Sequence, residues 1–359
     1  MKRVETNYCL ALMLTFLFSL VNMEMMAKPQ NVEKKKEINH SFKVDNNSCL
    51  QVDNKYGNIS ITHWNKEEVS MRIEIICKAN NERIAQENID RVSIDATMLG
   101  NKISAKTELK SSNKSTRNLS ININYYIQMP ATLKSELSQK YGNIYLPEKD
   151  NHEMDIEVKY GNLKAGDFVA PLSLEAKYSN VKVGNLTHAE IDLSYSGGAS
   201  IAKAHKLKID SRYSNTDIEQ IDELKISSNY GNVSIGQVNK LTLELAYGNA
   251  TIKKLNETLN ADELKYSNLT IHSLSPSFKQ FNVDARYGNV DVKLPANASF
   301  RVAAKEMKYS KCIINGFKME LISSNKSNNE FLYEINEGKQ PTLYFNGNNY
   351  ANLKIETVK

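Results

Sequence analysis

The chain has 359 residues, and its 46 Lys and Arg against 41 Asp and Glu give a formal net charge of +5 at pH 7. Such a mixed surface excludes a protein that binds polyanions through bulk positive charge, so no nucleic-acid partner is expected. Outside the first 27 residues the cysteines are Cys49, Cys77 and Cys312, too few and too odd a set for a disulfide framework. A single Cys49–Cys77 bridge stays open, and Cys312 has the parity of a small buried apolar residue.

The first 27 residues have the pattern of a secretory signal peptide. The charged start Met1-Lys-Arg precedes an apolar run over residues 10–21, and Ala27 offers a small residue for cleavage. The run is too short to span a membrane, and no later apolar stretch of the mature chain is long enough. We therefore expect residues 1–27 to direct export to the periplasm, the outer surface or the medium, and residues 28–39 to form a disordered linker.

Residues 40–130 are expected to form a β-rich N-terminal cap. Apolar and polar side chains alternate over several short segments, and Tyr56 opens a first Tyr-Gly-Asn motif. Residues 82–90 are compatible with one short helix. A cap of this kind covers the edge of the first coil of the array that follows.

A repeat organises residues 131–315. Tyr-Gly-Asn or Tyr-Ser-Asn recurs every 17 to 22 residues, with weaker copies at Tyr195 and Tyr309. Around Tyr247 the apolar residues alternate with period two on both sides of the motif, so each repeat contains two short strands and two turns. The predicted fold is all-β, a two-sheet parallel β-solenoid of about 17–22 residues per coil, in which each coil adds about 4.8 Å.

Three irregularities interrupt the period. The alternation changes phase at Glu263 and at Glu306, where we expect β-bulges. Residues 316–359 lose the period and contain a degraded copy of the motif at Tyr350. This last segment is expected to be a C-terminal cap.

The corner after each first strand carries the repeated motif. Gly and Ser alternate after the tyrosine, so the left-handed residue is expected to be the asparagine that follows. Stacking should align the asparagines in a hydrogen-bonded ladder and place the tyrosine rings, which have core parity, inside the corner. An exposed aromatic strip that binds sugar rings is the alternative. The ladder residues are Tyr160, Tyr178, Tyr213, Tyr230, Tyr247, Asn162, Asn180, Asn215, Asn232 and Asn249.

Two columns of charge flank the tyrosines on the outward face of the first sheet. An acidic residue stands three positions before most tyrosines and a basic residue one position before. The columns are either a solvated face that keeps the sheet soluble or a strip that binds surface polysaccharide. The candidate ligand-binding residues are Lys159, Lys177, Arg212, Lys265 and Arg286.

No catalytic residue, metal site or cofactor is predicted. The carboxylates of the repeats occupy one equivalent position, which indicates repeated structure and not a unique acid–base pair. His188 and His205 are one coil apart, but they lack a third ligand.

Three segments resemble the bacterial putative-adhesin domain family, exported β-solenoid proteins with repeated Tyr-Gly/Ser-Asn coils. They are residues 50–61 (LQVDNKYGNISI), 126–130 (YIQMP) and 140–146 (KYGNIYL). The resemblance covers residues 40–314. It implies an exported, non-enzymatic protein of the cell envelope or surface with an adhesive or scaffold role.

Two other functions stay open. One is a polysaccharide-active β-helix enzyme, and the other is a periplasmic module that binds a protein in the envelope stress response. The expected partner is accordingly a surface polysaccharide or another envelope protein.

Overall fold

The computed structural model describes residues 32–111 and 119–358. The expected signal peptide, residues 1–27, and residues 28–31 of the expected linker lie outside the described residues. The chain forms two compact units. The larger unit holds Glu37–Glu74, Ile94–Glu108 and Ile123–Lys359, and the smaller one holds Ile75–Ser93, Leu109–Asn122 and the segment that ends at Lys36.

The described chain is β-structure apart from turns and one helix. The elements up to the first regular coil are β1 Val32–Lys43, β2 Cys49–Lys55, β3 Ile59–Trp64, β4 Glu68–Ala79, α2 Glu82–Ile89, β5 Val92–Leu99, β6 Lys102–Leu109 and β7 Ser120–Pro130. The regular coils contain β8 Lys134–Lys140, β9 Ile144–Tyr145, β10 Lys149–Asp150, β11 Met154–Lys159, β12 Asn162–Lys164, β13 Asp167–Phe168, β14 Leu172–Lys177, β15 Asn180–Ser194, β16 Gly198–Arg212, β17 Thr216–Asn229, β18 Val233–Ala246 and β19 Asn249–Lys265. The last elements are β20 Asn268–Ile271, β21 Gln280–Arg286, β22 Asn289–Leu294, β23 Phe300–Lys305, β24 Cys312–Asn315, β25 Met319–Asn325, β26 Glu330–Ile335, β27 Thr342–Asn348 and β28 Asn352–Thr357.

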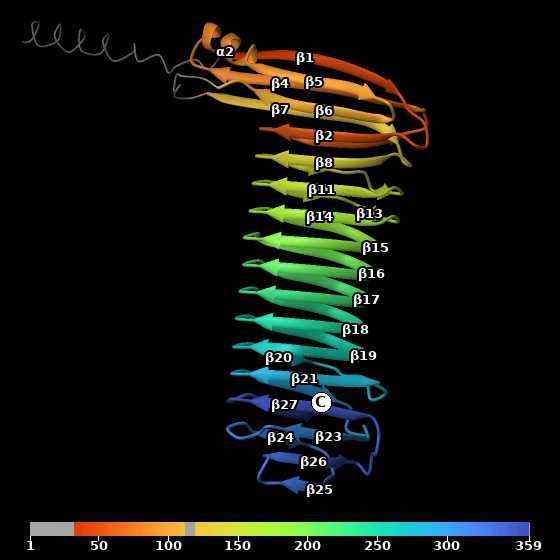
Figure 1. Ribbon diagram of the computed structural model, residues 1–359, viewed down its shortest axis with the longest axis vertical. Helices are drawn as coiled ribbons and strands as arrows, with labels where there is room; N and C mark the ends of the chain where they lie inside the picture. The colour runs from red at the N-terminus through yellow and green to blue at the C-terminus, as the bar shows by residue number, and fades with distance from the viewer. Residues whose placement is uncertain (1–31, 112–118, 359) are drawn as a thin grey trace, which may run out of the picture. The chain divides into compact units, whose positions relative to one another are not determined.

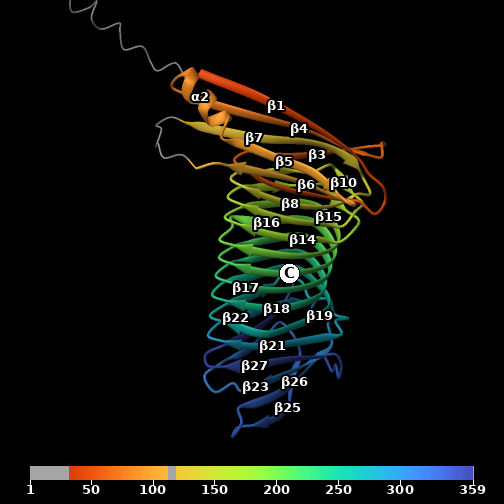
Figure 2. The ribbon, with the colours of Figure 1, turned by 45° about the horizontal axis from the view of Figure 1, so that its top comes forward.

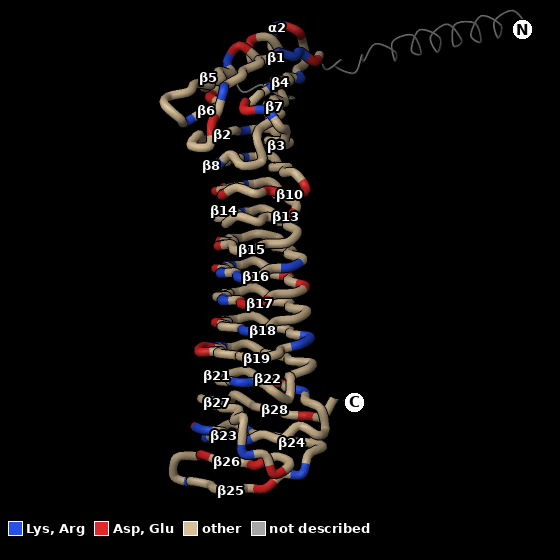
Figure 3. Tube along the Cα trace, turned by 90° about the vertical axis from the view of Figure 1, so that its right-hand side faces the viewer, with Lys and Arg blue, Asp and Glu red and all other residues tan. Residues whose placement is uncertain are grey.

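The larger unit is a two-sheet parallel β-solenoid, as the repeat predicts. Strands that precede a tyrosine pair in parallel in one sheet, and strands that follow it pair in parallel in the other (Figure 1). The tube in Figure 3, turned by 90°, shows the two sheets as the two sides of each flattened coil. In coils 180–265 each strand is 14 to 17 residues long, because it continues around the second corner from one sheet into the other.

The core of the solenoid consists of apolar side chains that stack along its axis. Because each coil pairs with the next in a register shifted by one whole repeat, equivalent residues of successive coils lie directly above one another. One such stack is Leu174, Ile191, Ile209, Ile226 and Leu243, none of them more than 2% exposed. Burial of these repeated columns is the main stabilising contribution to a coil that has no helix or disulfide to support it.

The first coil of the larger unit also contains a buried polar network. The Asn54 amide donates to the Gln139 Oε1 at 3.0 Å, and the Thr107 hydroxyl donates to the Asn54 Oδ1 at 2.9 Å. Thr107 also lies 2.8 Å from the hydroxyl of Tyr125, whose pKa burial raises to about 12. All four side chains are at most 1% exposed, so their polar atoms depend on hydrogen-bond partners within the chain.

Residues 32–39 are not a disordered linker, because they begin strand β1. The charges that favoured disorder are paired in the smaller unit. Glu33 lies 3.0 Å from Lys78 of β4, and Lys34 pairs with Glu82 of α2. Helix α2 agrees with the short helix expected there, and its cap Asn81 accepts a hydrogen bond from the Ile84 N–H at 2.9 Å.

The C-terminal segment is a cap only in part. A hairpin of β25 and β26 continues from β23 by antiparallel pairing, as Figure 2 shows at the blue end. Strand β27, however, lies between β21 and β23, and β28 lies between β22 and β24. Residues 342–357 therefore form a complete coil inserted between two coils that precede it in the sequence. Insertion is possible because residues 316–341 are long enough to return past the last coil.

Two of the smaller expectations are settled by the register. A bulge is present at the phase change near Glu263, where the pairing skips residues in β19. None is found at Glu306. Strand β23 ends at Lys305, and Glu306 has a φ of 55°, so the chain leaves the sheet there. Cys49 and Cys77 are free thiols, and Cys312 is half-buried, with a pKa that burial raises to about 12.

Candidate ligand-binding surface

One corner of the solenoid carries a continuous row of stacked tyrosines, here called the tyrosine column. Neighbouring ring centroids are 4.7 to 6.3 Å apart, and neighbouring planes are within 21° of parallel. In spatial order the members are Tyr56, Tyr141, Tyr160, Tyr178, Tyr195, Tyr213, Tyr230, Tyr247, Tyr266, Tyr287, Tyr350 and Tyr309. Tyr350, from the inserted coil, stacks on both Tyr287 and Tyr309.

The tyrosine column is on the surface and not inside the corner. Its members are 38 to 59% exposed, so the expectation of rings within the core is wrong and the exposed strip is what the structure contains. The parity argument fails because the tyrosine itself is the left-handed residue. From Tyr56 to Tyr287, and at Tyr350, φ lies between 49° and 62°. A left-handed residue ends the pleat, so its side chain no longer follows the alternation of the strand before it.

Stacking determines which part of each ring is available. Inside the column both faces of a ring are covered by its neighbours, so the surface presents ring edges and hydroxyl groups. Among the described residues no hydroxyl of the tyrosine column has a hydrogen-bond partner within the chain. The column is therefore a row of free hydroxyl groups at a regular spacing, and it is poorly suited to stacking sugars on ring faces.

The residue after each tyrosine lies against the neighbouring coil, and this close approach explains why it is a small residue, Gly or Ser. A Cβ at Gly142 would lie 1.5 Å from the Gly57 carbonyl oxygen, so the coils approach too closely there for a side chain. At Ser179, Ser196, Ser214 and Ser267 the serine is buried, and its hydroxyl donates to main-chain carbonyl oxygens. Ser179, for example, donates to the Lys177 carbonyl at 2.8 Å.

The asparagines form the expected ladder beside the tyrosines. In each step the Oδ1 of one asparagine accepts from the next side-chain amide, and in most steps also from the next backbone N–H. Asn162 donates both to Asn143, at 2.8 and 3.0 Å. One run contains Asn124, Asn58, Asn143, Asn162 and Asn180, and the other contains Asn215, Asn232, Asn249, Asn268, Asn289 and Asn352. The break falls at Gly197 and Gly198, where the motif lacks its asparagine.

The basic candidates lie on the outward face of the first sheet, next to the tyrosine column. Lys159 and Lys177 are register neighbours, as are Lys265 and Arg286. Arg212 stands apart from both pairs, because the adjacent positions are Ser194 and Asn229. Lys55 and Lys140 extend the first pair to a run of four, so the expected basic column is one run of four, one pair and one isolated arginine.

Several of these basic side chains are held by acidic neighbours. Lys159 pairs with Glu157 and lies 3.8 Å from Glu175, while Lys265 pairs with Glu263. The Glu157 hydrogen bond raises the pKa of Lys159, and the lysine lowers the pKa of Glu157. Lys177 instead lies over the ring of Tyr178, with its Nζ 5.7 Å from the centroid. The strip offers cations and carboxylates together, which suits a polar ligand of low net charge.

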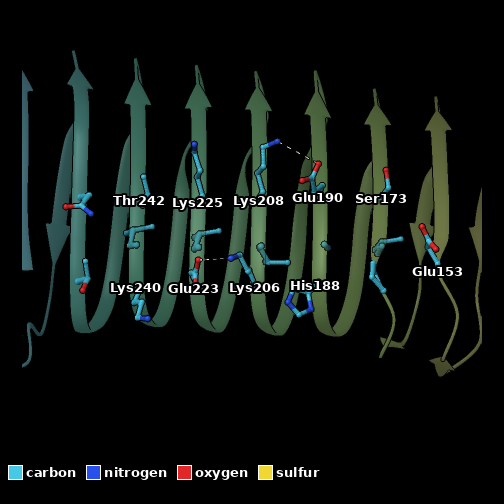
Figure 4. A pocket seen from close by; sticks show the side chains of 18 of the residues that line it. Glu153, Ser173, His188, Glu190, Lys206, Lys208, Glu223, Lys225, Lys240 and Thr242 are labelled. Carbon is cyan, nitrogen blue, oxygen red and sulfur yellow. Dashed lines mark ion pairs between the residues drawn. The ribbon is translucent and has the colours of Figure 1, made fainter. Parts of the chain in front are cut away.

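A shallow groove of about 780 Å³, which sequence reasoning missed, crosses the same sheet further from the tyrosines (Figure 4). Two ion pairs cross it, Lys206–Glu223 at 3.0 Å and Lys208–Glu190 at 3.7 Å. The lysine lowers the pKa of Glu223, which fits a charge pair and not a proton donor at neutral pH. The sequence signal that could have revealed this groove was the change between acidic and basic residues at equivalent positions of successive first strands.

The described residues contain one group of three side chains that could hold a metal ion, His63, Asp150 and His152. His63 is the penultimate residue of β3, and the other two lie at the second corner of the following coil. Asp150 is fully buried, and His152 is 3% exposed. Burial lowers the pKa of His152, which favours the neutral ring.

His188 and His205 do stack, with centroids 5.8 Å apart, but His205 pairs with Asp222 at 2.9 Å and no third ligand group joins them in the described residues. None of the helical structure in the described residues has the length and hydropathy of a membrane-spanning segment.

Several solved structures are similar to this chain at low identity and low TM-score. A putative adhesin of Parabacteroides distasonis ATCC 8503 is 11% identical over 90% of this chain and 97% of its own, with a TM-score of 0.33. A putative cell adhesion protein of Clostridium sporogenes ATCC 15579 is 13% identical over 90% and 100%, with a TM-score of 0.21. A putative lipid binding protein of P. distasonis is 13% identical over 69% and 97%, with a TM-score of 0.29. Scores this low carry no argument about fold or function.

No curated protein sequence matches the chain at a significant level. The family model described as Toastrack DUF4097 matches residues 70–308, which is well over half of the 359 residues. The matched range contains the coils from Tyr141 to Tyr287 and with them most of the tyrosine column. The chain therefore belongs to the Toastrack DUF4097 family.

Proposed function

We propose that this protein is an exported, non-enzymatic protein of the cell envelope that binds an extended polysaccharide lengthwise along the tyrosine column. The observation that carries the proposal is the column itself, twelve stacked rings that are 38 to 59% exposed. A row of identical groups, one per coil, matches a ligand that also repeats along its length.

The chemistry of the corner suits hydroxyl-rich chains. Tyrosine hydroxyls both donate and accept hydrogen bonds, and the neighbouring lysine and arginine side chains add donors for hydroxyl or carboxylate groups of a sugar. Each contact is weak because it is exposed to water. Many equivalent contacts on one rigid rod raise the overall affinity, since the first contact places the following ones at high effective concentration.

A non-enzymatic role agrees with the charge pairs of the first sheet. Glycoside hydrolysis needs a carboxylic acid that stays protonated near neutral pH beside a second carboxylate. The carboxylates Glu157 and Glu223 have lowered pKa values because lysines pair with them. They stabilise the outer face and do not supply an acid. Export is supported by the leader pattern in residues 1–27.

A glycan array, probed beside a panel of extracellular-matrix proteins at low and physiological salt, tests the proposal. The purified mature chain should bind one class of polysaccharide. The substitutions Lys159→Gln, Lys177→Gln and Arg212→Gln together should weaken this binding, most strongly at low salt, because exposed charges are screened at high salt.

The matched control removes three positive charges from exposed positions of the opposite sheet, as Lys164→Gln, Lys182→Gln and Lys293→Gln. It should bind like the unmodified protein. Equal losses of glycan binding in both triple variants would mean that only the net charge matters, and would count against a binding site at the tyrosine column. Silence on every glycan would contradict the proposal.

A second candidate function, binding of another envelope protein, is favoured by strand β25. All seven of its residues are exposed, including Met319, Leu321 and Ile322, and in the described chain it pairs only with β26. A free apolar edge strand can accept a strand from a partner. A photo-crosslinking residue in place of Leu321 should then give one discrete adduct in the envelope, and the absence of an adduct would remove this candidate.

A further inference from the structure

We propose that His63, Asp150 and His152 form a binding site for one divalent transition-metal ion, with Zn²⁺ the best fit. Asp150 is the acidic member of this group. Its side chain is fully buried, and neither carboxylate oxygen has a hydrogen-bond partner in the described chain. A buried carboxylate without compensation costs several kcal/mol in general, so a native structure keeps one only where something offsets the charge.

The two histidines do not supply that compensation through ordinary hydrogen bonds. The Nε2 of His63 is 3.0 Å from the Asp150 Oδ1, yet the two atoms are not aligned as donor and acceptor, and this nitrogen also lacks a hydrogen-bond partner. The Nδ1 of His152 is 3.9 Å from the same oxygen. Two nitrogens and an oxygen thus converge on one point without bonding to each other.

The distances and ligand types fit a metal. The three ligand atoms lie within 4.8 Å of one another. Ions bound at about 2.0–2.2 Å by imidazole and carboxylate have ligands at such separations. Two imidazoles and one carboxylate favour zinc and its neighbours in the first transition row, since calcium and magnesium prefer oxygen ligands alone. Three protein ligands leave a tetrahedral ion one further position.

The surroundings of His152 would fix its ring for this role. The Nε2 is 3.2 Å from the Ser135 hydroxyl, and the Nδ1 is 3.1 Å from the Ala131 carbonyl oxygen. Because a carbonyl oxygen only accepts, the Nδ1–H donates to Ala131 in the metal-free ring. Metal binding at Nδ1 therefore moves the proton to Nε2, from which the ring donates to Ser135, and the Nδ1 lone pair becomes available to the ion. Such an outer hydrogen bond is the usual device that selects the tautomer of a ligating histidine.

The site would join two coils that are distant in sequence. His63 belongs to the first coil, and Asp150 and His152 belong to the coil that pairs with it through β3 and β9. A metal here would stabilise the first coil of the solenoid. On one side the strands β2 and β3 of this coil pair with β6 and β7 and not with another regular coil. Binding to the folded form alone raises the melting temperature in proportion to the logarithm of the metal concentration.

The test uses tag-free protein that has been treated with a chelator. Titration with Zn²⁺ by calorimetry should give one equivalent per chain, and Co²⁺ should give the visible absorption of a low-symmetry site. Zn²⁺ should also raise the melting temperature. Ser135→Ala should lower the affinity by about 10- to 100-fold, as is typical for loss of an outer hydrogen bond to a ligand. The double variant His188→Gln, His205→Gln is the control for exposed histidines and should bind normally.

The melting temperature of the Asp150→Asn variant is measured without and with metal, and each measurement tests a different part of the proposal. In the chelated protein the substitution removes an uncompensated buried charge and should raise the melting temperature. It should also abolish the Zn²⁺-dependent rise. No stoichiometric binding by the unmodified protein, or unchanged binding in Asp150→Asn, would overturn the proposal. So would a lower melting temperature of chelated Asp150→Asn, because it would mean that protonated histidines already compensate the carboxylate.

Discussion

The asparagine ladder should make a measurable contribution to stability, and Asn232→Ala tests it. The substitution removes three hydrogen bonds of the Asn232 side chain. Its Oδ1 accepts from the backbone N–H and the amide of Asn249 at 3.2 and 3.3 Å, and its amide donates to Asn215 at 3.4 Å. A hydrogen bond generally contributes about 0.5–1.5 kcal/mol. These three are long and exposed, so the lower end applies and the expected loss is about 1–2 kcal/mol.

Urea denaturation followed by far-UV circular dichroism measures this loss. With an m-value of about 3 kcal/mol/M, the midpoint should fall by roughly 0.5 M. Asn232→Asp keeps both bonds accepted from Asn249 and should lose less than about 1 kcal/mol. The matched control is Asn229→Ala, an exposed asparagine of the same coil outside the ladder. If the midpoint of Asn232→Ala equals that of Asn229→Ala, the ladder does not stabilise the coil and the reasoning is refuted.

Three further predictions address the core, the inserted coil and the dependence on pH. Thr107→Val should cost about 2–4 kcal/mol in urea denaturation, because it leaves two buried atoms, the Asn54 Oδ1 and the Tyr125 hydroxyl oxygen, without a hydrogen bond; a loss below about 0.5 kcal/mol would contradict the network. Phe345→Ala should cost about 3–5 kcal/mol because Phe345 is fully buried in the inserted coil, whereas Tyr344→Ala, at a half-exposed position of the same strand, should have little effect. Similar losses in both variants would argue against insertion. The pKa of Asp167 is lowered by hydrogen bonds from the Asn185 backbone and side chain. Its contribution is therefore present above the unfolded pKa of about 3.9 and is lost as the pH falls below that value, so the stability difference between the unmodified protein and Asp167→Asn should be constant above about pH 5 and shrink toward pH 3.

The repeat and its parity were enough to predict the solenoid, because every coil repeats the same alternation and the same corner. The asparagine ladder followed from stacking alone. The position of the tyrosines did not follow, since parity holds only along a continuous strand and the tyrosine at the corner is left-handed. Both Ser and Gly follow the tyrosine in this sequence, which argues against a positive φ at that position. It does not show whether the tyrosine before this position or the asparagine after it has the positive φ.

The inserted coil was not predictable from order along the chain. The degraded motif around Tyr350 signalled one more coil, and adjacency in sequence placed it last. Its place between two earlier coils depends on the hairpin of residues 319–335, which occupies the end of the sheet instead. The cluster of His63, Asp150 and His152 was missed for a similar reason. Its members come from different coils, and only the spacing of Asp150 and His152 was visible in the sequence.

The central claim is that the hydroxyl edge of the tyrosine column binds a polysaccharide, and removal of hydroxyls alone tests it most directly. The triple variant Tyr213→Phe, Tyr230→Phe and Tyr247→Phe keeps the stacked rings and should keep the melting temperature. The control changes three exposed tyrosines outside the column, Tyr126, Tyr145 and Tyr344, to phenylalanine.

Both variants are measured by equilibrium binding to the polysaccharide that the array identifies. The account predicts that the column variant loses at least about tenfold in affinity, at roughly 0.5–1.5 kcal/mol for each hydrogen bond, while the control binds normally. Unchanged binding by the column variant would contradict the claim.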